Sequence, residues 1–136
     1  MRRRAVRPAK GPDLDVTPLV ARDRQVIESY GASGFRVSGI AYDSAILVLP
    51  QATLRWPVVT FAEVTFAGLA AVVDAGVQIL LLGCGNKMML VPPALRQELR
   101  GRGVVVDAMD TGAACRTYNV LLAEDRRVAA ALLRPR

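Results

Sequence analysis

The spacing of hydrophobic and polar residues changes near the middle of the chain. Before residue 50, short apolar runs are separated by turn residues, which predicts strands at residues 26–30, 35–42 and 45–49. We expect the second strand to be bulged at Ser38-Gly39. The connections are too short for crossovers, so these strands should form an antiparallel meander.

Beyond Trp56-Pro57 the pattern becomes helical. Trp56 itself is expected to be a buried anchor in an extended link. Apolar residues then recur at the spacing i, i+3, i+4, i+7, which predicts an amphipathic helix. These residues are Phe66, Leu69, Ala70 and Val73. Gly76 is expected just after the end of this helix, where a positive φ is needed.

Three continuous apolar runs follow, as is typical of strands buried on both faces. They cover residues 79–82, 104–106 and 128–133. The Ala content of the last run also allows a helix. Between the runs we predict one helix opened by Pro92-Pro93 and another with Thr111 as its N-cap. The order predicts one three-layer α/β domain with a mixed sheet. In it, the N-terminal meander is followed by β-α-β-α-β units, with the first two of the three runs paired in parallel.

Charge separates a tail from this domain. Residues 1–12 carry four arginines, one lysine and no acid, so nearly all of the net charge of +6 lies there. We therefore expect a flexible basic tail at residues 1–20 and the folded domain at residues 21–136. Such a tail supports at most peripheral contact with the inner face of a membrane, and no specific binding of nucleic acid. A mitochondrial targeting sequence is the alternative, but Pro8 and Pro12 interrupt a long helix.

Several classes of enzyme are excluded by composition. The chain has no histidine, which removes Ser-His-Asp and Cys-His machinery and most zinc sites. Two cysteines do not make a disulfide framework, and no apolar run reaches the roughly 18 residues that cross a bilayer. We expect a soluble cytoplasmic protein with no catalytic residues, no metal and no cofactor.

Glycines and polar residues at two predicted strand ends, and in the last helix, form a candidate pocket or interaction site. They are Gly83, Cys84, Gly85, Asn86, Asp110, Thr111, Thr117, Tyr118 and Asn119. The loop lacks the spacing of a nucleotide fingerprint, so a tight turn is favoured over phosphate binding. Structural roles are also favoured for the polar residues: Asp110 or Thr111 would cap the helix, and Thr117 and Asn119 would bond loop backbone near Gly83.

Cys115 is a separate candidate for chemistry. It lies about one turn into the last helix, where the helix N-terminus can lower the pKa of a thiol. No histidine is present to act as a base, so a buried structural thiol is favoured over a catalytic or redox cysteine.

Several segments together resemble a known family over residues 26–133. They are Gly34-Phe35, Val48-Leu49-Pro50, Trp56, Leu82-Gly83-Cys84-Gly85, Met109-Asp110-Thr111, the stretch 114–119 and the stretch 124–132. The chain resembles the family of mitochondrial complex I assembly factor three, which includes bacterial relatives and an adipogenesis-associated animal protein. The resemblance implies a compact three-layer α/β domain without enzymatic activity. It departs at Cys84, where the family usually has Thr between the glycines.

The resemblance also implies a role. In mitochondria the family member helps to assemble NADH:ubiquinone oxidoreductase, together with a partner assembly factor. Our leading hypothesis is therefore a non-enzymatic protein-interaction module that aids assembly of a membrane-bound respiratory complex, with respiratory subunits or another assembly factor as partners. The alternative is a small-molecule-binding protein or enzyme that uses the loop at residues 83–86. That alternative needs a deep pocket at the strand ends, with Cys84, Thr117, Tyr118 or Asn119 pointing inward.

Overall fold

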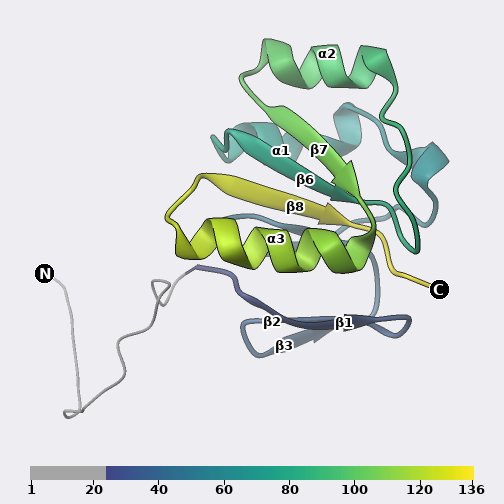
Figure 1. Cartoon of the computed structure of the whole chain (residues 1–136), viewed down its shortest axis with the longest axis vertical. Helices are drawn as coiled ribbons and strands as arrows, with labels where there is room; N and C mark the ends of the chain where they lie inside the picture. The colour runs from purple at the N-terminus through teal and green to yellow at the C-terminus, as the bar shows by residue number, and fades with distance from the viewer. Residues whose placement is uncertain (1–23) are drawn as a thin grey trace, which may run out of the picture.

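Eight strands and three α-helices make up residues 24–136, the part of the chain that the structure, a computed structural model, describes (Figure 1). The elements are β1 (Ile27–Gly31), β2 (Gly34–Val37), β3 (Ile40–Tyr42), β4 (Ile46–Val48), β5 (Thr53–Arg55), α1 (Ala70–Asp74), β6 (Ile79–Gly83), α2 (Pro93–Gly101), β7 (Val105–Met109), α3 (Thr111–Ala123) and β8 (Val128–Leu132). Short 3₁₀ turns at Phe61–Glu63 and Ala67–Leu69 precede α1. The basic tail predicted for residues 1–20 lies outside the described residues.

The larger sheet has five strands in the order β5-β4-β8-β6-β7. Strands β7, β6 and β8 run parallel, and Ile79 is paired with Val105, as the apolar runs predicted. Strand β4 is antiparallel to β8, and β5 is antiparallel to β4. The predicted mixed sheet is therefore confirmed, and the Ala-rich last run is a strand.

The larger sheet forms the middle layer of three. Helices α1 and α2 cover one face, and α3 with the small sheet β1-β2-β3 covers the other (Figure 1). Successive residues of β6 point to opposite faces, so Leu80 and Leu82 join the core under α2, whereas Leu81 joins the core under α3. A strand apolar at every position is thus buried on both sides, which confirms the three-layer α/β arrangement.

The N-terminal meander contains different strands from those predicted. Ser38 and Gly39 have φ values of 45° and 85°, so they form a two-residue hairpin turn between β2 and β3. The predicted bulge is wrong, because two successive positive φ angles suit a tight hairpin whose twist matches the strands. The small sheet is β1-β2-β3, and β4 belongs to the larger sheet instead.

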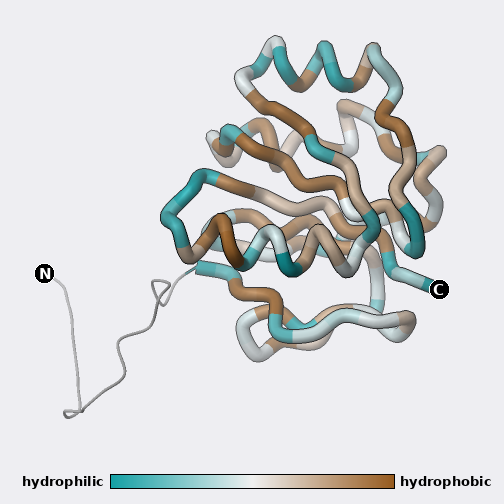
Figure 2. The backbone as a smooth tube through the Cα atoms, viewed as in Figure 1, coloured by the Kyte–Doolittle hydropathy of each residue, from teal (hydrophilic) through white to brown (hydrophobic). Residues whose placement is uncertain are grey.

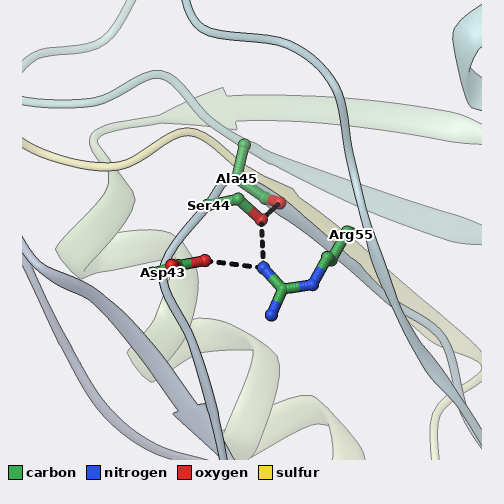
Figure 3. Close-up of polar contacts among 4 residues, drawn as sticks. All are labelled: Asp43, Ser44, Ala45 and Arg55. Carbon is green, nitrogen blue, oxygen red and sulfur yellow. Dashed lines mark hydrogen bonds and ion pairs between the residues drawn. The ribbon is translucent and has the colours of Figure 1, made fainter.

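A side-chain cluster marks the passage from the small sheet to the larger one. Arg55, at the end of β5, donates a hydrogen bond of 2.6 Å to the carboxylate of Asp43 and one of 3.5 Å to the hydroxyl of Ser44 (Figure 3). The hydrogen bond and positive charge of Arg55 lower the pKa of Asp43. The next residue, Trp56, is only 2% exposed, as expected of an anchor.

The helices begin and end close to the predicted positions. Gly76, with φ of 71°, follows α1, and Pro93 opens α2. The N-cap of α3 is Asp110 rather than Thr111, because the Asp110 carboxylate accepts a 2.8 Å hydrogen bond from the backbone N–H of Ala113. Thr111 is the first residue of the helix, and its hydroxyl bonds elsewhere.

Candidate functional site

Strands β6, β7 and β8 all end at the same edge of the sheet (Figure 1). Gly83, the last residue of β6, lies where the backbones crowd together. A Cβ added there would lie 2.8 Å from Cδ2 of Leu132 and 3.1 Å from Cα of Thr111. The next glycine, Gly85, has a φ of 92°. One glycine is thus required by close packing and the other by a turn, as the tight-turn interpretation proposed.

Thr111 joins the ends of these strands. Its buried hydroxyl accepts a 2.8 Å hydrogen bond from the backbone N–H of Gly85 and donates one of 2.6 Å to the carbonyl of Leu133. The Thr111 backbone N–H also donates to the carbonyl of Gly85 at 2.9 Å. Its hydroxyl proton is therefore already donated within the scaffold.

Cys84 lies beside this junction as a protonated thiol. It is 8% exposed, and its sulfur contacts the carbonyl of Leu82 at 3.6 Å. Burial raises the pKa of the thiol, and the backbone amides of Met89 and Met109 offset only part of that rise. A nucleophilic cysteine needs the opposite shift.

Asn86 holds the next turn of the loop against residue 136. Its side-chain N–H donates to the carbonyl of Arg136 at 3.0 Å, and its side-chain oxygen accepts from the backbone N–H of Arg136 at 2.5 Å. Both the N–H and the oxygen of the Asn86 amide are thus bonded to the backbone of one residue, Arg136. Asn86 positions the loop.

Tyr118 and Asn119 lie at a different place, where α3 contacts the start of the small sheet. The side chain of Asn119 accepts a 3.0 Å hydrogen bond from the N–H of Ile27 and donates one of 2.7 Å to its carbonyl. The Tyr118 hydroxyl donates to the carbonyl of Gln25 at 2.9 Å, and burial raises its pKa. The predicted bond from Asn119 to loop backbone near Gly83 is wrong.

Cys115 is buried under the same helix. It is 2% exposed, and burial raises the pKa of its thiol to about 12, although the neighbouring Arg116 opposes the rise. The helix N-terminus could lower this pKa, but loss of hydration outweighs its effect. The thiol is buried, as the favoured interpretation expected.

A hollow of about 300 Å³ opens beside Cys84. Cys84, Gly85 and Asn86 line it, whereas Thr117, Tyr118 and Asn119 do not. The rest of its wall comes from residues that the sequence did not single out: Val59, Thr60, Phe61, Lys87, Met89, Leu133, Arg134 and Arg136. A neighbouring hollow of about 530 Å³ shares Val59, Arg134 and Arg136 with it. One signal in the sequence could have pointed to this wall: the apolar run at residues 88–90, which fits neither a helix nor a strand.

Within residues 24–136, no three His, Cys, Asp or Glu side chains come together as a group that could hold a metal ion. None of the helices in that range has the length and apolar character needed to cross a membrane.

A family profile described as a protein of unknown function, DUF498/DUF598, matches residues 27–133. The chain belongs to this family. The match covers almost all of the described residues, from β1 to the residue after β8. It includes the glycine loop and α3, which carried the resemblance noted in the sequence.

Two relatives of the chain show the range of the family. The NADH dehydrogenase [ubiquinone] 1 alpha subcomplex assembly factor 3 of Xenopus tropicalis is 32% identical over 111 residues, which are 80% of this chain and 61% of that protein. The chain thus spans about three fifths of the length of that relative. An uncharacterised protein of Rhodobacter capsulatus is 38% identical over 109 residues, which are 79% of this chain and 82% of that protein.

A solved structure supports the fold. The chain resembles a Bordetella pertussis protein described as an Mth938-like domain, with a TM-score of 0.75 and 30% sequence identity. The match covers 89% of this chain and 91% of the Bordetella chain. The α/β fold of this chain is therefore shared with a solved bacterial protein of related sequence.

Proposed function

We propose that this domain is a non-enzymatic protein-interaction module that aids assembly of a membrane-bound respiratory complex of the complex I type. Its partners are respiratory subunits or a second assembly factor, and it acts at the cytoplasmic face of the membrane. The names of relatives such as the Xenopus assembly factor support the assembly role. The chain spans only part of that relative, so the role is proposed here for the shared domain.

One observation carries the non-enzymatic part of the proposal. The polar groups expected at a pocket bond the scaffold to itself: Thr111 joins strand ends, Asn86 holds the loop, and Asn119 holds β1. Both cysteines are protonated at neutral pH, because burial raises the pKa of each. A catalytic site would need free polar groups aimed at a substrate.

The proposal is tested by deleting the gene in the native host and measuring assembled complex I on native gels, together with NADH:quinone activity in membranes. We expect partially assembled intermediates to accumulate and activity to fall, with both restored by the wild-type chain. Unchanged levels of assembled complex and unchanged activity would overturn the proposal. A metabolite that co-purifies in the hollow beside Cys84 would favour the small-molecule alternative.

A further inference from the structure

Exposed apolar side chains gather at the edge where the parallel strands end. Nine large hydrophobic residues are exposed among the described residues, and four of them lie at this edge or next to it in the chain: two line the hollow beside Cys84, and two are the immediate neighbours of Met89. They are Val59 (69% exposed), Met88 (53%), Met89 (38%) and Leu90 (83%). Figure 2 shows the hydrophobic stretch in the connection that leads into α2. Clustered exposed apolar residues, and methionines in particular, are typical of protein-binding surfaces.

Positive charge surrounds the same residues. Lys87, Arg134 and Arg136 are exposed and line the hollow beside Cys84, and no Asp or Glu lines it. The adjoining hollow contains one acid, Asp43, whose carboxylate is already paired with Arg55 at 2.6 Å. Among the residues that line the two hollows, basic side chains thus outnumber acidic ones, and they form a rim around an apolar floor.

The loop that carries this surface is fixed at both ends. At its start, Asn86 is bonded to the backbone of Arg136. At its end, Val91 is buried in the core that α2 covers. An exposed apolar segment held in this way loses little conformational freedom when a partner binds, which favours affinity.

We infer that this basic-apolar edge, formed by Val59, Lys87, Met88, Met89, Leu90 and Arg134, is the docking surface for an acidic segment of a partner protein. The segment carries apolar side chains for the floor and Asp or Glu for the rim, because opposite charge selects the partner and steers its approach. The inference rests on the proposed function and assigns its surface. A concave floor between Val59 and Met89 suits a peptide chain better than a planar lipid surface.

The partner is found with a photo-crosslinking amino acid placed at position 90 of the full chain in the native host. The matched control carries it at position 120, because Val120 is also an exposed apolar residue (56%) but lies on α3. We expect position 90 to crosslink to a segment that contains acidic residues among apolar ones, and position 120 to give far less product. Crosslinks to that segment from position 120 alone would overturn the inference.

A synthetic peptide of the crosslinked segment then measures the contribution of each feature. Arg134→Glu should weaken its binding about tenfold at low salt, with a smaller effect at high salt, as expected of a rim charge. Leu90→Ser should weaken binding at all salt concentrations. The controls Arg126→Glu and Val120→Ser, which change exposed residues elsewhere, should bind as the wild type does. Equal affinity of all four variants would contradict the inference.

Other occupants give distinct results. Binding to phosphatidylglycerol vesicles that Leu90→Ser abolishes, or a concentration-dependent dimer that it dissociates, would overturn the peptide assignment. A crosslinked partner without any part in respiratory assembly would leave the surface intact and contradict the proposed function. Loss of complex I in the deletion strain, with no crosslink from position 90, would contradict the surface and leave the function standing.

Discussion

The hydroxyl oxygen of Thr111 lies 2.8 Å from the backbone nitrogen of Gly85 and accepts its hydrogen bond, although 26 positions separate the two residues. The same hydroxyl donates to the carbonyl of Leu133. One buried side chain thus joins the start of α3 to the residues that follow β6 and β8, at the edge where a ligand would bind in many α/β proteins.

The first prediction concerns this hydroxyl. Thr111→Val keeps the shape but leaves the Gly85 N–H and the Leu133 carbonyl without their partner in a buried place. The free energy of unfolding should fall by about 2–4 kcal/mol, because each buried unsatisfied group costs roughly 1–3 kcal/mol. Urea unfolding followed by circular dichroism measures the change. Thr111→Ser keeps the hydroxyl, so its free energy of unfolding should fall clearly less. Equal falls for the two variants would show that the methyl group, not the hydroxyl, stabilises the fold.

The second prediction concerns Gly83. Gly83→Ala places a Cβ 2.8 Å from the Leu132 side chain and 3.1 Å from Thr111 Cα, so the core must shift. We expect a loss of about 1–3 kcal/mol in the free energy of unfolding, typical of overpacking. Gly101→Ala is the matched control, because nothing lies within 4 Å of a Cβ built at Gly101. Thermal unfolding that is the same for both variants would contradict the packing argument.

The third prediction concerns the attachment of the small sheet. Asn119→Asp retains the acceptor for the Ile27 N–H and removes the donor to the Ile27 carbonyl. Hydrogen exchange followed by mass spectrometry should show faster exchange in β1–β3, with little change in β6–β8, since the two sheets share no strand. Uniformly faster exchange across both sheets would indicate one cooperative unit and refute the local role.

The fourth prediction follows from Cys115. Its thiol ionises near pH 9 when unfolded and near pH 12 when folded, so the unfolded state releases its proton first as pH rises. The stability that the neutral buried thiol contributes is therefore complete below about pH 9 and is lost progressively between pH 9 and 12. Denaturant titrations at pH 8.5 and 10.5 measure this. Cys115→Ala should flatten the decline, and an unchanged slope would rule out this thiol as its source.

Features encoded within a few residues could be predicted from the sequence. The strand at Ile79, the helix opened by Pro93 and the stop at Gly76 each depend on a local apolar run, a fixed φ or a positive φ. The turn at Ser38-Gly39 was misread, because positive φ angles suit both a bulge and a hairpin turn. Strand β5 was missed because three residues carry no readable period.

The candidate site was harder to predict, because its bonds join distant parts of the chain. Residues predicted to share one site separate in the fold: Asn86 bonds to Arg136, whereas Asn119 bonds to Ile27 on the far face of the sheet. Residue type indicated that these side chains would find backbone partners but not which ones. Arg134, at the rim of the hollow, lies far from the loop in sequence and carried no signal of its own.

The central claim is that the domain acts through its surface and that its buried cysteines do no chemistry. Complementation of the deletion strain tests it most directly, with assembled complex I measured on native gels. A folded Cys84→Ala/Cys115→Ala chain should restore the complex to the wild-type level, whereas a folded Leu90→Ser/Arg134→Glu chain should not. Failure of the folded cysteine-free chain, with full rescue by the surface variant, would contradict the account.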